Sequence, residues 1–148
     1  MTNEIAQYFF FKLSEDIYAI EASSVGEMLT YQEYTKVPMM PPYIKGVTNI
    51  RGNIITVIDL LQRLGLGEVN INKKTSFVII DKIALIIDEV HEVNTIAVED
   101  IKSTLDFGFK IEPRFVKNMA KYHDDYIAIL NFDEILKLSE ISKIEGTL

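Results

Sequence analysis

Apolar residues along this chain fall in short runs that are separated by polar or glycine-containing breaks. The aromatic run at 7–13 and the apolar run at 17–20 flank the polar tripeptide at 14–16, a pattern that predicts a β-hairpin. Between 46 and 58, two β-branched runs are joined through the polar and glycine residues 49–53, which also favours a hairpin. The first half of the chain is therefore expected to contain two antiparallel strand pairs.

One segment of the first half shows helical rather than alternating spacing. In 22–30, Val25 and Met28 are three residues apart and follow serines that can cap a first turn, so we predict one short helix. The prolines in 37–42 lack amide donors and predict an extended loop. Asp59 precedes a leucine-rich stretch and is expected to cap a single helical turn.

The second half repeats the strand pattern after a polar connection at 68–74, where we expect a subdomain boundary. Pro113 is expected to begin an irregular segment, and Asp133 to cap a last helical turn. Many short strands with few helices predict a mainly β fold of two small β-barrels, formed by 7–67 and 75–138. The apolar strands predicted in the second barrel are 75–80, 83–87, 90–98 and 126–132.

Composition and charge narrow the classes of function. With 48% hydrophobic and 25% charged residues, the chain can bury a core and stay soluble, and without cysteine it has no disulfides or thiolate ligands. The net charge is −7 and no basic stripe is present, which argues against nucleic-acid binding. We read no export signal, and no uncharged apolar run reaches the roughly 20 residues of a membrane helix. We therefore expect a cytoplasmic protein without membrane insertion.

The candidate catalytic and metal-binding residues are not expected to converge. His91 lies in an acidic segment, but strand alternation would place only two ligands on one face, too few for a closed metal site. His123 and the aspartates after it fit a polar turn better than a calcium or acid–base site. The aromatic run at 8–11 is expected to be core, and neither a nucleophile elbow nor a phosphate loop occurs. We expect no enzymatic activity, no cofactor and no metal.

The stretch IKGVTNIRG at 44–52, continued to Asp59, resembles the signature segment of the CheW family of chemotaxis adaptors. Flanking segments agree, so that the resemblance extends over residues 7–138. Two departures concern the second half. Glu89 stands where the family tends to have glycine, and 118–121 replaces a glycine-rich turn expected ahead of the last strand, so that turn is expected to be built differently.

The resemblance implies a single CheW-like domain over 1–148, with two SH3-like, five-stranded β-barrel subdomains packed around a shared hydrophobic interface and a few short helices. It implies a non-catalytic adaptor that couples the cytoplasmic tips of methyl-accepting chemoreceptors to the regulatory domain of the CheA histidine kinase, in the cytoplasm and at membrane receptor arrays. The kinase contact is expected among apolar residues at the end of the second barrel. The receptor-binding residues that the resemblance implies are Val25, Glu27, Met28, Thr35, Gly46, Asn49, Arg51 and Gly52.

The residues themselves leave several alternatives open. Arg51, at a hairpin turn, can present several donors to a partner, although exposed arginines commonly serve only solubility. We hypothesise that Glu27 pairs with Arg51 and fixes its orientation. Val25 and Met28 fit a core as well as an exposed docking ridge. Two other functions remain: a CheW-like domain detached from a larger signalling protein, and a small-molecule-binding β-barrel.

Overall fold

The computed structural model describes residues 5–103 and 110–137, whose strands form two β-sheets. The first sheet contains β1 (Ile5–Leu13), β2 (Asp16–Glu21), β8 (Glu89–Ala97), β9 (Ile101–Lys102), β10 (Val116–Tyr122) and β11 (Asp125–Leu130). The second contains β3 (Glu27–Thr30), β4 (Ile44–Ile50), β5 (Asn53–Asp59), β6 (Ser76–Ile80) and β7 (Ile83–Ile87). The helical elements are α1 (Leu60–Arg63), α2 (Phe132–Ile135) and the 3₁₀ turns η1 (Ala22–Ser24), η2 (Val98–Asp100) and η3 (Pro113–Phe115).

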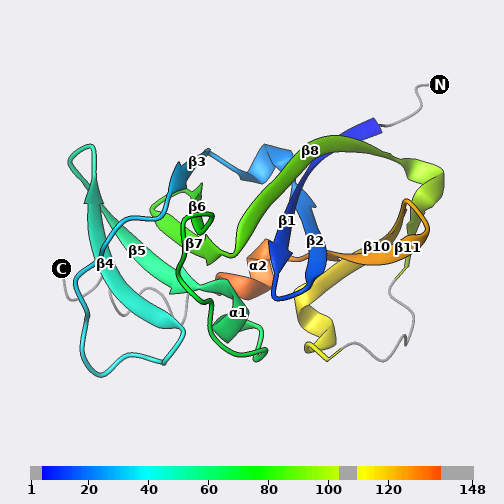
Figure 1. The fold of residues 1–148 in the computed structure, drawn as a ribbon. Helices are drawn as coiled ribbons and strands as arrows, with labels where there is room; N and C mark the ends of the chain where they lie inside the picture. The colour runs from blue at the N-terminus through cyan, green and yellow to red at the C-terminus, as the bar shows by residue number, and fades with distance from the viewer. Residues whose placement is uncertain (1–4, 104–109, 138–148) are drawn as a thin grey trace.

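The two sheets lie side by side, with α1 and α2 between them (Figure 1). The strand orders are β8-β1-β2-β11-β10-β9 and β3-β6-β7-β5-β4. The predicted mainly β class with a few short helices is therefore confirmed. One sheet has the expected five strands and the other has six.

The sheets do not follow the predicted subdomain ranges 7–67 and 75–138. The first hairpin, β1 and β2, pairs with β8 and β11 from the second half of the chain, whereas β6 and β7 pair with strands of the first half. Of these long-range connections, β2 with β11 and β5 with β7 are parallel, whereas β1 with β8 and β3 with β6 are antiparallel. Local hydrophobic patterns predict strands but do not reveal such partners, which is why a division in chain order was expected.

The aromatic run of β1 is divided between two cores. Phe9 and Phe11 belong to a large core that also contains Phe77 and other residues of the five-stranded sheet. Tyr8 and Phe10 belong to a smaller core within the six-stranded sheet. Since successive strand residues point to opposite faces, a continuous aromatic run can be buried along its whole length. The core role predicted for these aromatics is confirmed, and the large core joins the two sheets.

The helix predicted over 22–30 is wrong. Only its first residues form a helical turn, η1, and its last four form β3, which pairs antiparallel with β6. The N–H of Gly26 donates to the carbonyl oxygen of Ile79 at 2.8 Å, and burial alternates along β3. Pairing with a sheet thus outweighs the helical spacing of Val25 and Met28.

The four strands predicted in the second half correspond to β6, β7, β8 and β11. The short irregular segment predicted to begin at Pro113 corresponds to η3. The turn expected at 118–121 is wrong, because these residues belong to β10, a strand that the sequence prediction missed. The chain reverses instead at His123, which has a left-handed φ of 57°. The cap of α2 is Asn131, whose side chain accepts a hydrogen bond from a backbone N–H of the helix, rather than Asp133. The cap predicted for α1, Asp59, is confirmed.

Candidate functional site

The tip of the β4-β5 hairpin presents Arg51 to solvent. Arg51 and Gly52 are the two turn residues, with left-handed φ values of 52° and 83°, as a type I′ turn requires. The N–H of Gly52 donates to Oδ1 of Asn49 at 2.9 Å, which closes the turn. Asn49 and Gly52 thus shape the tip, while 67% of the Arg51 side chain is exposed.

Arg51 forms a two-point ion pair with Glu27 of β3. The guanidinium Nη1 donates to Oε1 of Glu27, and Nη2 donates to Oε2 at 2.9 Å. Hydrogen bonding from Arg51 lowers the pKa of the Glu27 carboxyl, and the same contact raises the pKa of the guanidinium. The hypothesised pairing is therefore confirmed. Because β3 and β4 are the two edge strands of the five-stranded sheet, the pair connects one edge to the hairpin that forms the other.

Thr35 and Gly46 fasten the loop after β3 onto β4. Thr35 and Val47 exchange two backbone hydrogen bonds, of 2.8 and 2.9 Å. A Cβ at Gly46 would overlap the carbonyl group of Thr35, lying 2.7 Å from its carbon. Glycine is therefore needed at Gly46 so that two backbones can approach. Thr35 and Gly46 therefore determine the shape of this end of the sheet.

Val25 and Met28 differ in exposure. Val25 is half-buried and packs against the large core, whereas Met28 has 39% of its area exposed. The sequence prediction missed Ile54, which pairs with Asn49 across the hairpin and is 49% exposed. Ile54 lies in an apolar run like those of buried strands, so the sequence did not mark it as an exposed residue. Met28, on the edge strand β3, and Ile54, on β5 next to the other edge strand, add exposed apolar surface to this sheet.

Three contacts link six of the eight predicted residues in pairs, whereas Val25 packs against the core and Met28 is exposed on β3. The structure joins Glu27 to Arg51, Thr35 to the β4 backbone at Gly46 and its neighbour, and Asn49 to Gly52. We call the region that these eight residues occupy the hairpin edge. It consists of Val25, Glu27, Met28, Thr35, Gly46, Asn49, Arg51 and Gly52.

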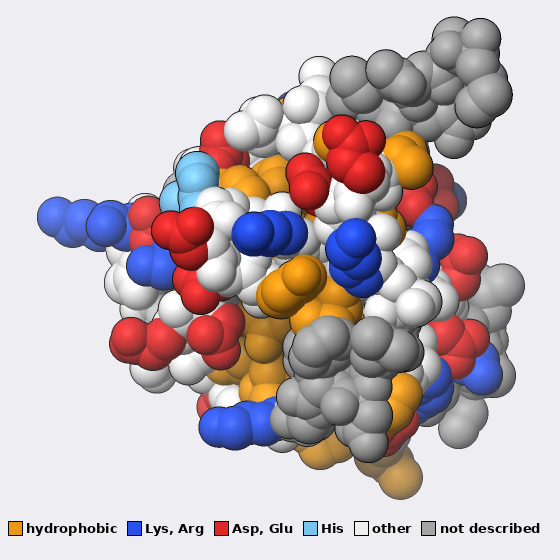
Figure 2. Space-filling view, turned by 90° about the vertical axis from the view of Figure 1, so that its right-hand side faces the viewer, with side chains coloured by type: hydrophobic (Ala, Val, Ile, Leu, Met, Phe, Trp, Pro, Cys, Tyr) orange, Lys and Arg blue, Asp and Glu red, His pale blue; other side chains and the backbone are white. Residues whose placement is uncertain are grey.

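The acidic segment around His91 does not assemble a metal site in the described parts of the chain, and no group of three potential ligands occurs there. Asp88 accepts a hydrogen bond from the N–H of Ser14, and Glu89 lies 3.9 Å from the ammonium of Lys74. Nε2 of His91 lies 3.8 Å from a carboxylate oxygen of Glu92, so only these two potential ligands of the described segment are close together. Figure 2 shows histidine side chains at one margin of a face where acidic groups border hydrophobic surface. Across residues 5–103 and 110–137, no helix has the length and apolarity needed to cross a bilayer.

Comparison with protein families gives a match over most of the chain. The family model described as CheW-like domain matches residues 7–140, which include the hairpin edge and both sheets except the first two residues of β1. Among solved structures, the chain is similar to the one titled scaffolding protein TtCheW from Thermoanaerobacter tengcongensis. The TM-score is 0.83 at 32% sequence identity, and the similarity covers 90% of this chain and 94% of the other.

Curated relatives agree with the family match. The chain is 32% identical to the chemotaxis protein CheW of Bacillus subtilis, over 80% of this chain and 79% of the relative. It is 26% identical to the chemotaxis protein CheW of Treponema pallidum, over 97% of this chain and 89% of the relative. On these matches in sequence and fold, the chain belongs to the CheW-like domain family.

Proposed function

We propose that this protein, a chemotaxis scaffold by family, couples the cytoplasmic tips of methyl-accepting chemoreceptors to the regulatory domain of the CheA histidine kinase. In this proposal it works in the cytoplasm at receptor arrays and performs no catalysis. The observation that carries the receptor contact is the exposed, two-point Glu27–Arg51 pair at the hairpin edge. Family membership supports the class of function, and the geometry of the edge supports the place of binding.

The ion pair suits recognition better than stability. Ion pairs at an exposed surface contribute little to folding, because water solvates both charges and the side chains lose freedom. Glu27 nevertheless holds the guanidinium in one orientation through two of its five N–H groups. The other donors can meet carbonyl or carboxylate oxygens of a receptor, and a pre-oriented donor loses less conformational entropy on binding.

The hairpin edge divides into residues that shape it and residues that can contact a partner. Gly46 and Thr35 hold the loop on β4, as described above. Arg51 and Met28 are exposed and supply a charged and an apolar contact, respectively. Apolar side chains around a charged contact such as Arg51 exclude water from it when a partner binds. We therefore include the exposed Ile54 among the proposed contacts.

The kinase contact is proposed on the six-stranded sheet. Among described residues of the second half, Val93, Val98 and Tyr126 each have half or more of their area exposed. Val93 and Val98 lie on or directly after the edge strand β8. Exposed apolar side chains on an edge strand support protein association. Receptor and kinase would then bind different sheets, which allows one molecule to hold both.

The test measures binding of a receptor tip fragment to purified variants. We expect Arg51→Ala to weaken binding at least tenfold, and Arg51→Lys to restore only part of it, because an ammonium cannot reproduce the planar fork. Arg114→Ala is the matched control, since Arg114 is also surface-exposed and paired with a glutamate, Glu112, at 2.7 Å. Unchanged receptor binding by a folded Arg51→Ala protein would exclude the hairpin edge as the receptor site.

A further inference from the structure

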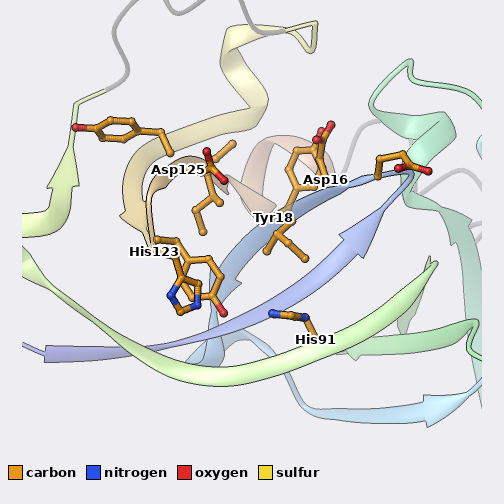
Figure 3. A pocket seen from close by; sticks show the side chains of 11 residues that line it. Asp16, Tyr18, His91, His123 and Asp125 are labelled. Carbon is orange, nitrogen blue, oxygen red and sulfur yellow. The ribbon is translucent and has the colours of Figure 1, made fainter.

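A cavity of about 650 Å³ lies at one end of the six-stranded sheet, away from the hairpin edge. Its walls come from β2, β8 and the β10-β11 hairpin, as Figure 3 shows. We call it the histidine pocket and define it by Asp16, Tyr18, His91, His123 and Asp125. Its volume falls in the range of small-molecule sites, which is typically about 300–1,000 Å³.

The curl of the sheet builds this pocket. In the strand order, β8 and β10 are separated by three strands, yet the ring centroids of His91 and Tyr122 are 6.2 Å apart. The ring of Tyr122 also stacks on that of Phe10, with centroids 4.4 Å apart, and its centroid lies 4.3 Å from that of His123. The two histidines, 32 positions apart in the sequence, are thus brought to one aromatic cluster.

The charges around the pocket are of one sign. Glu15, Asp16 and Asp125 line it, and neither lysine nor arginine is among its described lining residues. Within the described chain these three carboxylates form neither hydrogen bonds nor ion pairs through their side chains. The Asp16 charge reaches the pocket wall, because it adds to burial in raising the pKa of Tyr18. An unpaired negative field beside aromatic faces attracts cations.

We infer that the histidine pocket binds a small organic cation that carries a guanidinium group. A planar guanidinium stacks on aromatic rings such as Tyr18 and donates in pairs to carboxylates such as Asp16 and Asp125. A bare metal ion fits less well, since no group of three potential ligands forms among the described residues. The pocket volume also exceeds what one guanidinium fills, so a whole molecule of amino-acid size is the expected ligand.

The test uses nuclear magnetic resonance titration of the full-length protein with N-acetyl-arginine amide. The neutral isostere N-acetyl-citrulline amide is the matched probe, because it keeps the shape and hydrogen bonds but lacks the charge. We expect saturable shifts at pocket residues with the arginine probe, and binding at least tenfold weaker with the citrulline probe. Added salt should weaken binding of the arginine probe.

Substitutions distinguish binding in the histidine pocket from nonspecific attraction of a cation to an acidic protein. Asp16→Asn combined with Asp125→Asn should weaken binding of the arginine probe at least tenfold, and both residues are exposed, so the fold should persist. Asp81→Asn is the control, because Asp81 is an exposed turn acid outside the pocket. Equal binding of the two probes, or shifts that survive in the double variant, would overturn the inference. Receptor binding by the double variant should stay unchanged, so the inference and the proposed function fail separately.

Discussion

Gly46→Ala tests whether close backbone packing builds the hairpin edge. The new methyl group would overlap the carbonyl oxygen of Thr35 and lie 2.7 Å from its carbon and 3.0 Å from Cα of Lys36. All of these are backbone atoms, so no flexible side chain can move aside. The loop must therefore shift away from β4, and the two backbone hydrogen bonds between Thr35 and Val47 must lengthen or break.

The expected loss in free energy of unfolding is estimated from the two hydrogen bonds between Thr35 and Val47. A backbone hydrogen bond contributes about 1 kcal/mol net to stability, so the loss of two lowers the free energy of unfolding by about 2 kcal/mol. The φ of 156° at Gly46, which L residues rarely adopt, adds about 1 kcal/mol of backbone strain, for a total of about 3 kcal/mol. In a protein of this size, such a change lowers Tm by about 6–12 °C.

Urea denaturation followed by circular dichroism measures the change, with Gly52→Ala as the matched control. Gly52 has a φ of 83° but no atom within 4 Å of an added Cβ, so its substitution costs about 1 kcal/mol of backbone strain alone. We expect Gly46→Ala to be clearly the more destabilised of the two. Equal free energies of unfolding for the two variants would refute the steric reasoning.

Three further predictions concern charged residues. Arg51→Ala should raise the Glu27 carboxyl pKa toward its ordinary value in a carbon-13 titration. In the wild type the lowered pKa contributes only a little to stability, because the pair is exposed; this contribution is complete above the ordinary pKa and is lost as pH falls below it through the lowered pKa of the folded state. Asp59→Ala should lower the free energy of unfolding by about 3 kcal/mol in urea, because the buried carboxylate accepts hydrogen bonds from two backbone amides at 3.0 Å. Arg63→Met should speed hydrogen exchange in α2, since Arg63 donates to the carbonyl oxygen of Ile135 at 2.8 Å; unchanged exchange would contradict that role.

Local chemistry made much of the fold predictable. The turn residues Arg51 and Gly52 lie between β-branched runs, so the hairpin could be located from the sequence. Asp59 before a leucine-rich turn likewise predicted its cap correctly. These features depend on residues close together in the chain, which is why pattern alone was sufficient.

Long-range pairing was not predictable in the same way. Residues 27–30 have weak helical spacing, and only the partner strand β6, about 50 positions later, makes them a strand. The parallel pairing of β2 with β11 has no local signal in the sequence, so the predicted assignment of strands to subdomains in chain order, 7–67 and 75–138, does not match the sheets. His91 was interpreted as part of an acidic strand end and His123 as part of a polar turn, and only the curl of the sheet brings them to one pocket. By contrast, opposite charge at two mapped positions sufficed to predict the Glu27–Arg51 pair.

The proposed function requires one molecule to hold receptor and kinase at the same time through different surfaces. Sedimentation velocity of the protein mixed with a receptor tip fragment and a CheA regulatory domain measures whether it does. We expect a ternary complex that sediments faster than either binary complex, and that loses only the receptor fragment when Arg51→Ala replaces the wild type. Mutually exclusive binding of the two fragments would exclude the proposed coupling.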